Sequence, residues 1–324
     1  MSLWHADDDT ELEPGQCALC PDQPPSEVLI AGPSPQGRGF AVVRCTGCGL
    51  LFTDPRPTRT GIGRYYAADY YSYRFVGARR RSHRLKVGLW RALGLLPPPS
   101  RPDEDRPLPR LVRGLLTRHG GAASALRLPA PYQGARFLDV GCGAGERLEL
   151  ARELGWETFG VDLGEDAVRL AAARGHGTAV ANAEELPFAG TSLDYLNAGH
   201  VLEHLYDPVA FLRECRRVLR FDGVVQLTVP HCASWGARRY GALWRAYDVP
   251  RHLYHFTAET LGELVSRAGL RVTQVRTLPD EWVLQESQRA AVEKVSAGWW
   301  PTFLGRRRAR QGDGENLDVW CRMG

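Results

Sequence analysis

The sequence lacks several features that would assign it to a special class of protein. No run of about 18 consecutive apolar residues occurs, so we expect no membrane span. The N-terminus has no basic region followed by an apolar stretch, which argues against a secretory signal and for a cytoplasmic location. The net charge of +4 is small for 324 residues and does not by itself point to nucleic acid. With 44% hydrophobic and 24% charged residues, the composition is that of a globular protein.

Four of the eight cysteines fall in two Cys-x-x-Cys pairs, Cys17/Cys20 and Cys45/Cys48. In a chain without an export signal, this spacing is typical of a metal site rather than of disulfides. Four thiolates suit tetrahedral Zn²⁺ and leave no coordination position for a substrate, so the ion would be structural. A segment of about 40 residues buries little core, and metal binding would supply part of its folding free energy. Free buried thiols or a redox dithiol are the alternatives.

From residue 135 onward, short apolar runs alternate with amphipathic segments. This order predicts an α/β domain with a parallel sheet and helices on both of its faces. The strands are expected at residues 136–140, 158–162, 177–181, 192–198, 224–229, 271–277 and 316–322. The helices are expected at residues 145–154, 165–174, 208–219, 258–268 and 281–297.

Composition divides the chain into four segments. They are a disordered, solvated tail (1–15), the zinc-binding module (16–60), a helical cap with a Pro-rich linker (61–134) and the α/β domain (135–324). Within the last segment, residues 230–256 are too many for an ordinary connection and are rich in aromatics, Arg and His, which indicates a lid. Residues 280–312 form a second insertion.

A glycine-dense turn follows the first strand of the α/β domain. Residues 137–145 read FLDVGCGAG, so an apolar strand ends in Gly141, Gly143 and Gly145 before a helix opens. Glycines let a backbone approach a ligand closely, and Asp162 at the end of the next strand can accept hydrogen bonds from a ribose diol. A dinucleotide and S-adenosylmethionine (SAM) both fit this pattern.

Charge distinguishes the two ligands. The dinucleotide fingerprint needs a third glycine where Glu146 stands, and a carboxylate there would repel a diphosphate. Asp139, directly before the turn, suits an ammonium group. SAM carries an ammonium and a sulfonium and no phosphate, so the residues favour SAM over NAD. A scaffold of this kind that binds nothing is the remaining alternative.

In these motifs the sequence resembles class I SAM-dependent methyltransferases, over residues 135–277 plus the last strand. The resemblance implies a Rossmann-like seven-stranded methyltransferase sheet that binds SAM at the glycine turn, the second strand, the loop at 182–188 and the fourth strand. An Asp is commoner in the family where Asn182 stands, although an Asn oxygen can also accept from an adenine amino group. The residues so implicated are Asp139, Gly141, Cys142, Gly143, Gly145, Asp162, Leu163, Asn182, Ala183, Glu184, Gly199 and His200.

The cysteine-rich segment resembles a narrower group. Residues 43–57, followed by Tyr65, Tyr66, Tyr70 and Tyr71, are similar to bacterial small-molecule methyltransferases with an N-terminal zinc-binding module of four cysteines. Sugar C-methyltransferases share this layout but carry a long additional C-terminal domain that this chain lacks. The resemblance implies a small-molecule acceptor, such as a natural product, a sugar or a glycan precursor.

Three histidines follow strands whose carboxyl ends would face a ligand. Methyl transfer is an in-line displacement that often requires removal of a proton, and histidine is a suitable base near neutral pH. His200 and His204 follow the fourth strand, and His231 follows the fifth. The resemblance to sugar C-methyltransferases would place the general base at the pair Glu203–His204. A purely structural role for this pair is the alternative.

The expected lid offers candidate substrate contacts. Tyr247, Arg251 and His252 would meet a polar or anionic acceptor, or else pin the lid to the sheet. Two other functions compete: a nucleic-acid methyltransferase guided by the zinc module, and a non-catalytic protein that binds SAM or zinc. The first predicts Asn/Asp-Pro-Pro-Tyr/Phe where residues 197–200 read NAGH, and the second predicts a damaged glycine turn. The methylated atom and the oligomeric state stay open.

Overall fold

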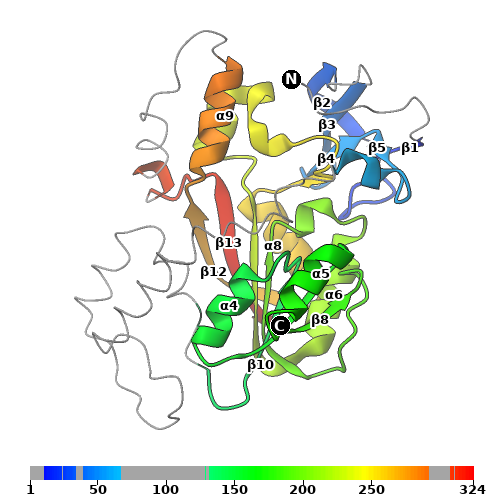
Figure 1. Cartoon of the computed structure of the whole chain (residues 1–324). Coiled ribbons are helices and arrows are strands. Elements are labelled where there is room, and N and C mark those ends of the chain that lie inside the picture. The colour runs from blue at the N-terminus through cyan, green and yellow to red at the C-terminus, as the bar shows by residue number, and fades with distance from the viewer. Residues whose placement is uncertain are drawn as a thin grey trace.

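The fold is built around one large sheet with a smaller sheet beyond one end of its strands (Figure 1). The structure, a computed structural model, describes residues 11–23, 25–33, 39–66, 128, 131–291, 307–309 and 311–324. Most of the expected cap at 61–134, with Tyr70 and Tyr71, lies outside these residues, as do residues 292–306 of the second insertion. In the described part of the chain, no helix is long and apolar enough to cross a bilayer.

The large sheet has seven strands and is mixed rather than fully parallel. Its order is β12 (Leu270–Leu278), β13 (Asn316–Met323), β10 (Leu219–Pro230), β9 (Leu193–Gly199), β6 (Arg136–Val140), β7 (Glu157–Asp162) and β8 (Gly177–Val180). The strands from β10 to β8 are parallel, whereas β13 is antiparallel to both of its neighbours. The prediction of a parallel sheet was therefore wrong for β13. The first residue of β13, Asn316, pairs with the last residue of β12, Leu278, so the chain re-enters the sheet at the end where it left and must run back.

Two helices, α6 and α8, begin at side chains that cap them. The Asp207 side chain accepts from the Ala210 N–H and Pro208 occupies the first helical position, while Thr257 and Thr260 form a capping box. The α-helices are α4 (Glu146–Glu153), α5 (Glu165–Ala172), α6 (Pro208–Val218), α7 (Trp235–Tyr240), α8 (Ala258–Arg267) and α9 (Glu281–Ala291). The 3-10 helices are η1 (Ile62–Tyr65), η3 (Leu202–His204), η4 (Gly241–Leu243) and η5 (Arg245–Tyr247).

The two faces of the sheet belong to separate cores, as expected for a strand whose side chains alternate. Leu138 and Val140 of β6 share one core with residues of α6 and α8. Phe137, adjacent to Leu138 along the strand, shares the other with residues of α4 and α5. In Figure 1, α4 and α5 lie in front of the sheet. The prediction of helices on both faces is confirmed.

The small sheet joins the N-terminal module to the lid. Its order is β11 (Tyr254–His255), β4 (Leu51–Asp54), β3 (Gly39–Cys45) and β2 (Pro25–Pro33), so a strand from the expected lid completes the sheet of the cysteine-rich segment. A separate two-stranded ladder pairs β1 (Leu12–Glu13) with β5 (Arg56–Pro57). Residues 12 and 13, expected within a disordered tail, are thus ordered, because the Glu13 carboxylate lies 2.7 Å from Nε of Arg56.

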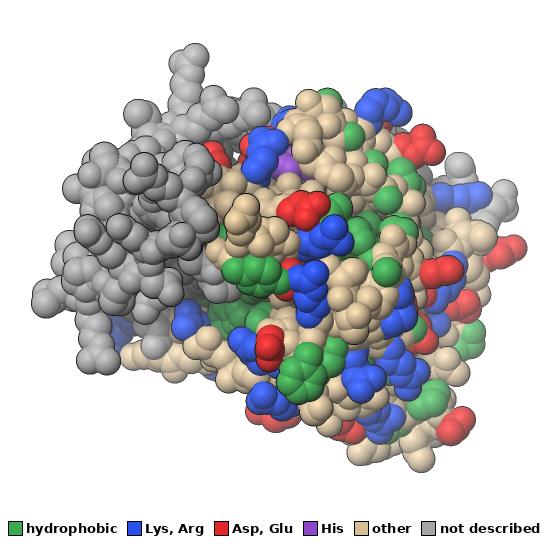
Figure 2. Space-filling model, turned by 90° about the horizontal axis from the view of Figure 1, so that it is seen from below, with side chains coloured by type: hydrophobic (Ala, Val, Ile, Leu, Met, Phe, Trp, Pro, Cys, Tyr) green, Lys and Arg blue, Asp and Glu red, His purple; other side chains and the backbone are tan. Residues whose placement is uncertain are grey.

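Seen from the end of the sheet opposite the lid, the surface mixes both signs of charge (Figure 2). Arginines are interspersed with acidic residues there. Nε of Arg136 lies 3.1 Å from the Glu157 carboxylate, and Nη1 of Arg220 lies 2.9 Å from that of Asp194. Much of the positive charge on this face is therefore balanced locally.

Candidate active site and cysteine cluster

The glycine turn after β6 adopts a backbone that only glycine takes easily. Gly141, Gly143 and Gly145 have φ angles of 69°, 50° and 86°. A Cβ on Gly141 would lie 2.7 Å from Cγ2 of Val201, and one on Gly145 would lie 3.1 Å from Cβ of Ala171. The turn therefore requires glycines. The side chains of Val201, just before η3, and of Ala171 on α5 occupy the space that Cβ atoms at Gly141 and Gly145 would need.

Asp162, at the carboxyl end of β7, is fixed against this turn. The Gly143 N–H donates to its Oδ2 and the Gly164 N–H to its Oδ1, each at 2.9 Å. Each oxygen keeps a further lone pair that can accept a hydroxyl proton. The next residue, Leu163, is 72% exposed. The carboxylate and an apolar side chain thus stand together at the edge where a nucleoside is expected.

Asp139 lies under the turn and is almost fully buried, with 4% of its surface exposed. Burial raises the pKa of its carboxyl group to about 7, against the lowering effects of Arg147 and Asn197. Nδ2 of Asn197 donates to Asp139 Oδ1 at 2.6 Å. No sequence motif indicates a role for Asn197. The two residues are register partners on β6 and β9, a signal available only once the strand order is known.

Two other predicted cofactor residues have different surroundings. The Cys142 side chain is buried, and a Cβ on Gly160 would lie 2.8 Å from its Sγ, so Cys142 presents backbone rather than sulfur to the turn. Burial raises the pKa of its thiol above the usual range. Gly199 ends β9, and a Cβ there would meet only Nδ2 of Asn197, at 3.9 Å.

The loop after β8 is held by contacts of its own. Oδ1 of Asn182 accepts from the Glu184 N–H at 3.1 Å, and Ala183 is buried. The Glu184 carboxylate accepts from the Asp207 N–H at 2.9 Å and lies 2.7 Å from Nη2 of Arg59. Glu184 therefore links the N-terminal segment to the α/β domain.

His200 and Glu203 form a hydrogen-bonded pair at the carboxyl end of β9. Nδ1 of His200 lies 3.1 Å from Oε1 of Glu203; the His200 side chain is 39% exposed and that of Glu203 is fully buried. Burial would lower the pKa of His200, but the bond to Glu203 outweighs it and raises that pKa. Burial would raise the pKa of Glu203, but the histidines around it hold that pKa well below its usual range. His200 adopts a φ of 57°, which is uncommon for a residue other than glycine.

His204 is half-buried and contacts the lid. Its Nδ1 lies 2.9 Å from the Tyr66 hydroxyl and 3.1 Å from the Arg251 carbonyl oxygen. Burial, and then the neighbouring His252, lower the pKa of His204 to about 4. The His204 and His252 rings meet edge to face with their centres 4.6 Å apart, and Nδ1 of His252 lies 2.8 Å from the Ala246 carbonyl oxygen.

The remaining predicted residues contact the protein itself. Nη2 of Arg251 lies 2.6 Å from Oδ1 of Asp248, and the Tyr247 ring packs against His255. Nδ1 of His231 lies 3.3 Å from the Gly314 carbonyl oxygen, and burial lowers the His231 pKa. These contacts hold the lid in place, and contact of these residues with a substrate stays a prediction.

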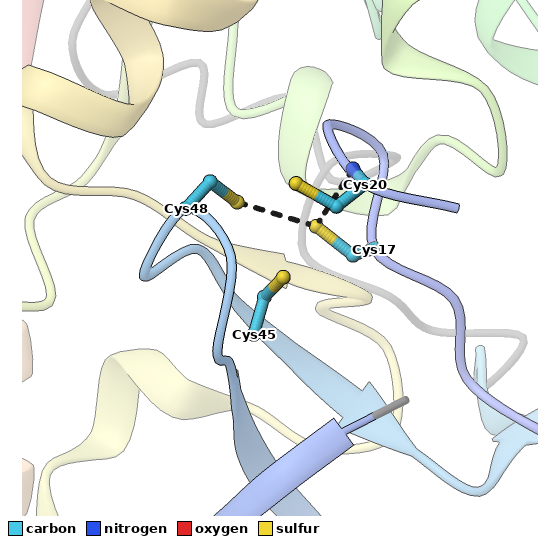
Figure 3. Close-up of side chains that lie close together, drawn as sticks. All are labelled: Cys17, Cys20, Cys45 and Cys48. Carbon is cyan, nitrogen blue, oxygen red and sulfur yellow. Dashed lines mark hydrogen bonds between the residues drawn. The ribbon is translucent and has the colours of Figure 1, made fainter. Parts of the chain in front are cut away.

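The four paired cysteines converge on one point (Figure 3). Their sulfur atoms lie within 4.8 Å of one another, and those of Cys17 and Cys48 are 3.5 Å apart. Burial raises the pKa of Cys17 and Cys20 to about 11 and that of Cys48 to about 12. For Cys45, the N–H groups of Cys48 and Gly47 outweigh burial and lower the pKa. Such a cluster is stable as thiolates when a cation lies among the sulfurs, and four sulfurs fit Zn²⁺.

Comparison with known proteins identifies the α/β domain. A family model described as a methyltransferase domain matches residues 109–275, more than half of the chain. The chain belongs to the methyltransferase-domain family. This membership confirms the prediction of a methyltransferase domain and supports SAM as the cofactor of that domain.

Relatives of this methyltransferase domain have modest identity. A Cereibacter sphaeroides protein named ubiquinone biosynthesis O-methyltransferase is 30% identical over 157 residues, which cover 45% of this chain and 64% of that protein. A Mycolicibacterium smegmatis protein named as a probable S-adenosylmethionine-dependent methyltransferase is 32% identical over 155 residues, 45% of this chain and 56% of that one. An S-adenosylmethionine-dependent methyltransferase structure from Mesorhizobium loti is 20% identical, covers 64% of this chain and 99% of that one, and has a TM-score of 0.44.

Proposed function

We propose that this chain transfers a methyl group from SAM to a small-molecule acceptor, and that its four paired cysteines hold a structural Zn²⁺. The observation that supports the cofactor most strongly is Asp162, which is tied to the glycine turn through Gly143 and retains acceptor capacity on both oxygens. A diphosphate would meet this carboxylate and that of Glu146 at the same turn, whereas a ribose diol can donate to Asp162.

Binding would use the carboxyl ends of neighbouring strands. Asp139 would attract the ammonium group of the methionine portion, Asp162 would accept from the ribose hydroxyls, and the exposed Leu163 would cover one face of the adenine. Asn182 and Ala183 would contact the adenine edge. When bound, SAM supplies a methyl group on a positively charged sulfur.

His200 is the residue best placed to take a proton from the acceptor. Its Nδ1–H donates to Glu203, which leaves the lone pair of Nε2 as the basic site. Glu203 would orient the ring and stabilise the imidazolium that forms, as carboxylates do for catalytic histidines. The acceptor's proton would pass to Nε2 while its freed electron pair forms the bond to the methyl carbon. His204, which is half-buried and has a lowered pKa, suits this task less well.

Two observations favour a small-molecule acceptor over nucleic acid. Several relatives are named O-methyltransferases of ubiquinone biosynthesis, which supports a small acceptor with oxygen as the methylated atom. Within the described residues, Arg136 and Arg220 pair with carboxylates instead of adding to a basic stripe.

The proposal is tested by supplying methyl-labelled SAM to purified protein with three separate substrate pools. The pools are a small-molecule extract of the source cells, their total nucleic acid and their total protein. We expect label in the small-molecule pool, and much less there with an Asp162→Asn variant at a SAM concentration near the Kd of the unaltered chain. Label confined to nuclease-sensitive material would contradict the proposed acceptor class.

A further inference from the structure

A second group of potential metal ligands lies apart from the cysteines. Glu203, His204 and His252 each offer one ligand atom, and these atoms lie within 4.8 Å of one another. The first two stand on η3, directly after β9, and the third comes from the lid. Two imidazoles and a carboxylate are the ligand set of many divalent transition-metal sites.

One carboxylate oxygen of Glu203 has no hydrogen-bond partner among the described residues. Glu203 is fully buried, and its Oε1 is used by Nδ1 of His200. Its Oε2 is buried as well and, in the described part of the chain, has no hydrogen-bond partner. A buried, unpartnered carboxylate oxygen is costly for a folded protein, and a cation at this point would remove the cost.

The hydrogen bonds of both histidines are compatible with metal binding through Nε2. A backbone carbonyl can only accept, so the contact with the Ala246 carbonyl oxygen requires a proton on Nδ1 of His252. Nδ1 of His204 lies near the Arg251 carbonyl oxygen and the Tyr66 hydroxyl, and a proton on this nitrogen can be donated to either oxygen. A neutral imidazole then has its lone pair on Nε2. Metal-ligating histidines commonly donate their other ring N–H to a carbonyl or carboxylate in this way.

A protonated His252 paired with acidic neighbours explains the cluster less well. Nε2 of His252 lies 3.7 Å from Oδ2 of Asp248, which is too long for a hydrogen bond. The other oxygen of Asp248 already accepts from Arg251 at 2.6 Å. Such pairing would also leave Oε2 of Glu203 unpartnered.

We propose that Glu203, His204 and His252 bind a divalent transition-metal ion beside the methyl-acceptor position. The chemistry of the ligands suits Zn²⁺, Mn²⁺, Fe²⁺ or Co²⁺ better than Ca²⁺. η3 borders the glycine turn, because Cγ2 of Val201 occupies the space beside Gly141. On the proposed function, on which this role rests, the ion would hold the acceptor oxygen and lower the pKa of its hydroxyl group, and His200 would take the released proton.

The experiment is a Co²⁺ titration of the full chain with zinc in its cysteine cluster, followed by visible absorption and by metal analysis. We expect one bound Co²⁺ per chain without the intense charge-transfer bands of a thiolate site. Glu203→Gln keeps an acceptor for His200, and His252→Asn keeps a donor for Ala246, so both preserve the local hydrogen bonds. Each should weaken Co²⁺ binding by about 100-fold or more, as loss of a direct ligand exceeds the roughly 10–100-fold cost of losing an outer partner.

His231→Asn is the matched control, because His231 also contacts a backbone carbonyl but lies outside the cluster. It should bind Co²⁺ as the unaltered chain does. Equal Co²⁺ binding by all three variants would overturn the inference. A chain that binds S-adenosylhomocysteine but takes up no Co²⁺ beyond its cysteines would also overturn it, and would leave the proposed function intact. Failure to bind S-adenosylhomocysteine would instead count against the proposed function.

Discussion

The hydroxyl group of Thr53 donates a 2.6 Å hydrogen bond to the backbone carbonyl of His252, and this contact joins the cysteine module to the lid. Thr53 is fully buried on β4, and its N–H also donates to the Leu253 carbonyl at 2.9 Å. Its hydroxyl lies 3.2 Å from Nε2 of His255. The module thus fixes the backbone of a lid histidine whose side chain meets His204, so the cysteine module and the candidate active site are connected through the lid.

Thr53→Val should loosen this connection without disturbing the cofactor site. The variant keeps the side-chain shape, leaves the His252 carbonyl without its donor, and should lower the free energy of unfolding by about 1–3 kcal/mol. Affinity for S-adenosylhomocysteine should stay unchanged, because the predicted cofactor residues lie in the glycine turn after β6 and at the end of β7, not on β4. Urea denaturation and calorimetry measure the two effects. The control is Thr60→Val, whose hydroxyl is exposed; a matching loss of stability there would argue against this account of Thr53.

Cys48→Ser should remove the zinc and with it the order of the small sheet. Metal analysis should show about one zinc fewer per chain in the variant than in the unaltered chain, and thermal unfolding of the variant should begin at a lower temperature. Cys232→Ser provides the comparison, because Cys232 is a free cysteine that lies outside the cluster. If the unaltered chain is soluble, folded and free of metal, the zinc assignment fails.

Asp162→Asn should weaken S-adenosylhomocysteine binding. Loss of charge-assisted hydrogen bonds to the ribose should cost about 2 kcal/mol, a roughly 30-fold rise in Kd. Asp166→Asn is the matched control, since Asp166 is 80% exposed on α5 and pairs only with Arg169 among the described contacts. Calorimetric titration of both variants checks the prediction, and an unchanged Kd for Asp162→Asn would remove the ribose assignment.

Asp139 should make cofactor binding depend on pH near neutrality. Its carboxyl pKa of about 7 in the free protein means that it is ionised above pH 7 and protonated below. A bound ammonium group favours the ionised form, so affinity should be greatest above pH 7 and fall by up to about tenfold per unit as the pH drops below 7. Kd measured across this range should show the slope in the unaltered chain and lose it in Asp139→Asn. The same slope in both would mean that another group is responsible.

The local sequence was sufficient to predict the helices and strands of the α/β domain and the glycine turn. The capping residues Asp207 and Thr257, and the alternation of Phe137, Leu138 and Val140 between the faces of β6, act over a few residues. Their consequences follow from spacing alone, because helix capping and strand alternation are local properties. The expected strands of the α/β domain accordingly match the observed ones to within a few residues, apart from an earlier start of β10.

Contacts between distant segments could not be predicted in this way. The pairing of Asp139 with Asn197 depends on β9 lying beside β6, and the pairing of β11 with β4 depends on where the lid folds back. The approach of His252 to His204 follows from that second pairing. Each of these arrangements is set by strand order and by packing of the whole molecule, and a single sequence carries no direct record of either.

The central claim is that the glycine turn and Asp162 hold a sulfonium nucleoside and not a dinucleotide. The most direct measurement is a pair of calorimetric titrations of the purified chain, one with S-adenosylhomocysteine and one with NADH, under identical conditions. The account predicts saturable binding of S-adenosylhomocysteine at one site per chain and no measurable binding of NADH. Saturable binding of NADH without binding of S-adenosylhomocysteine would contradict it.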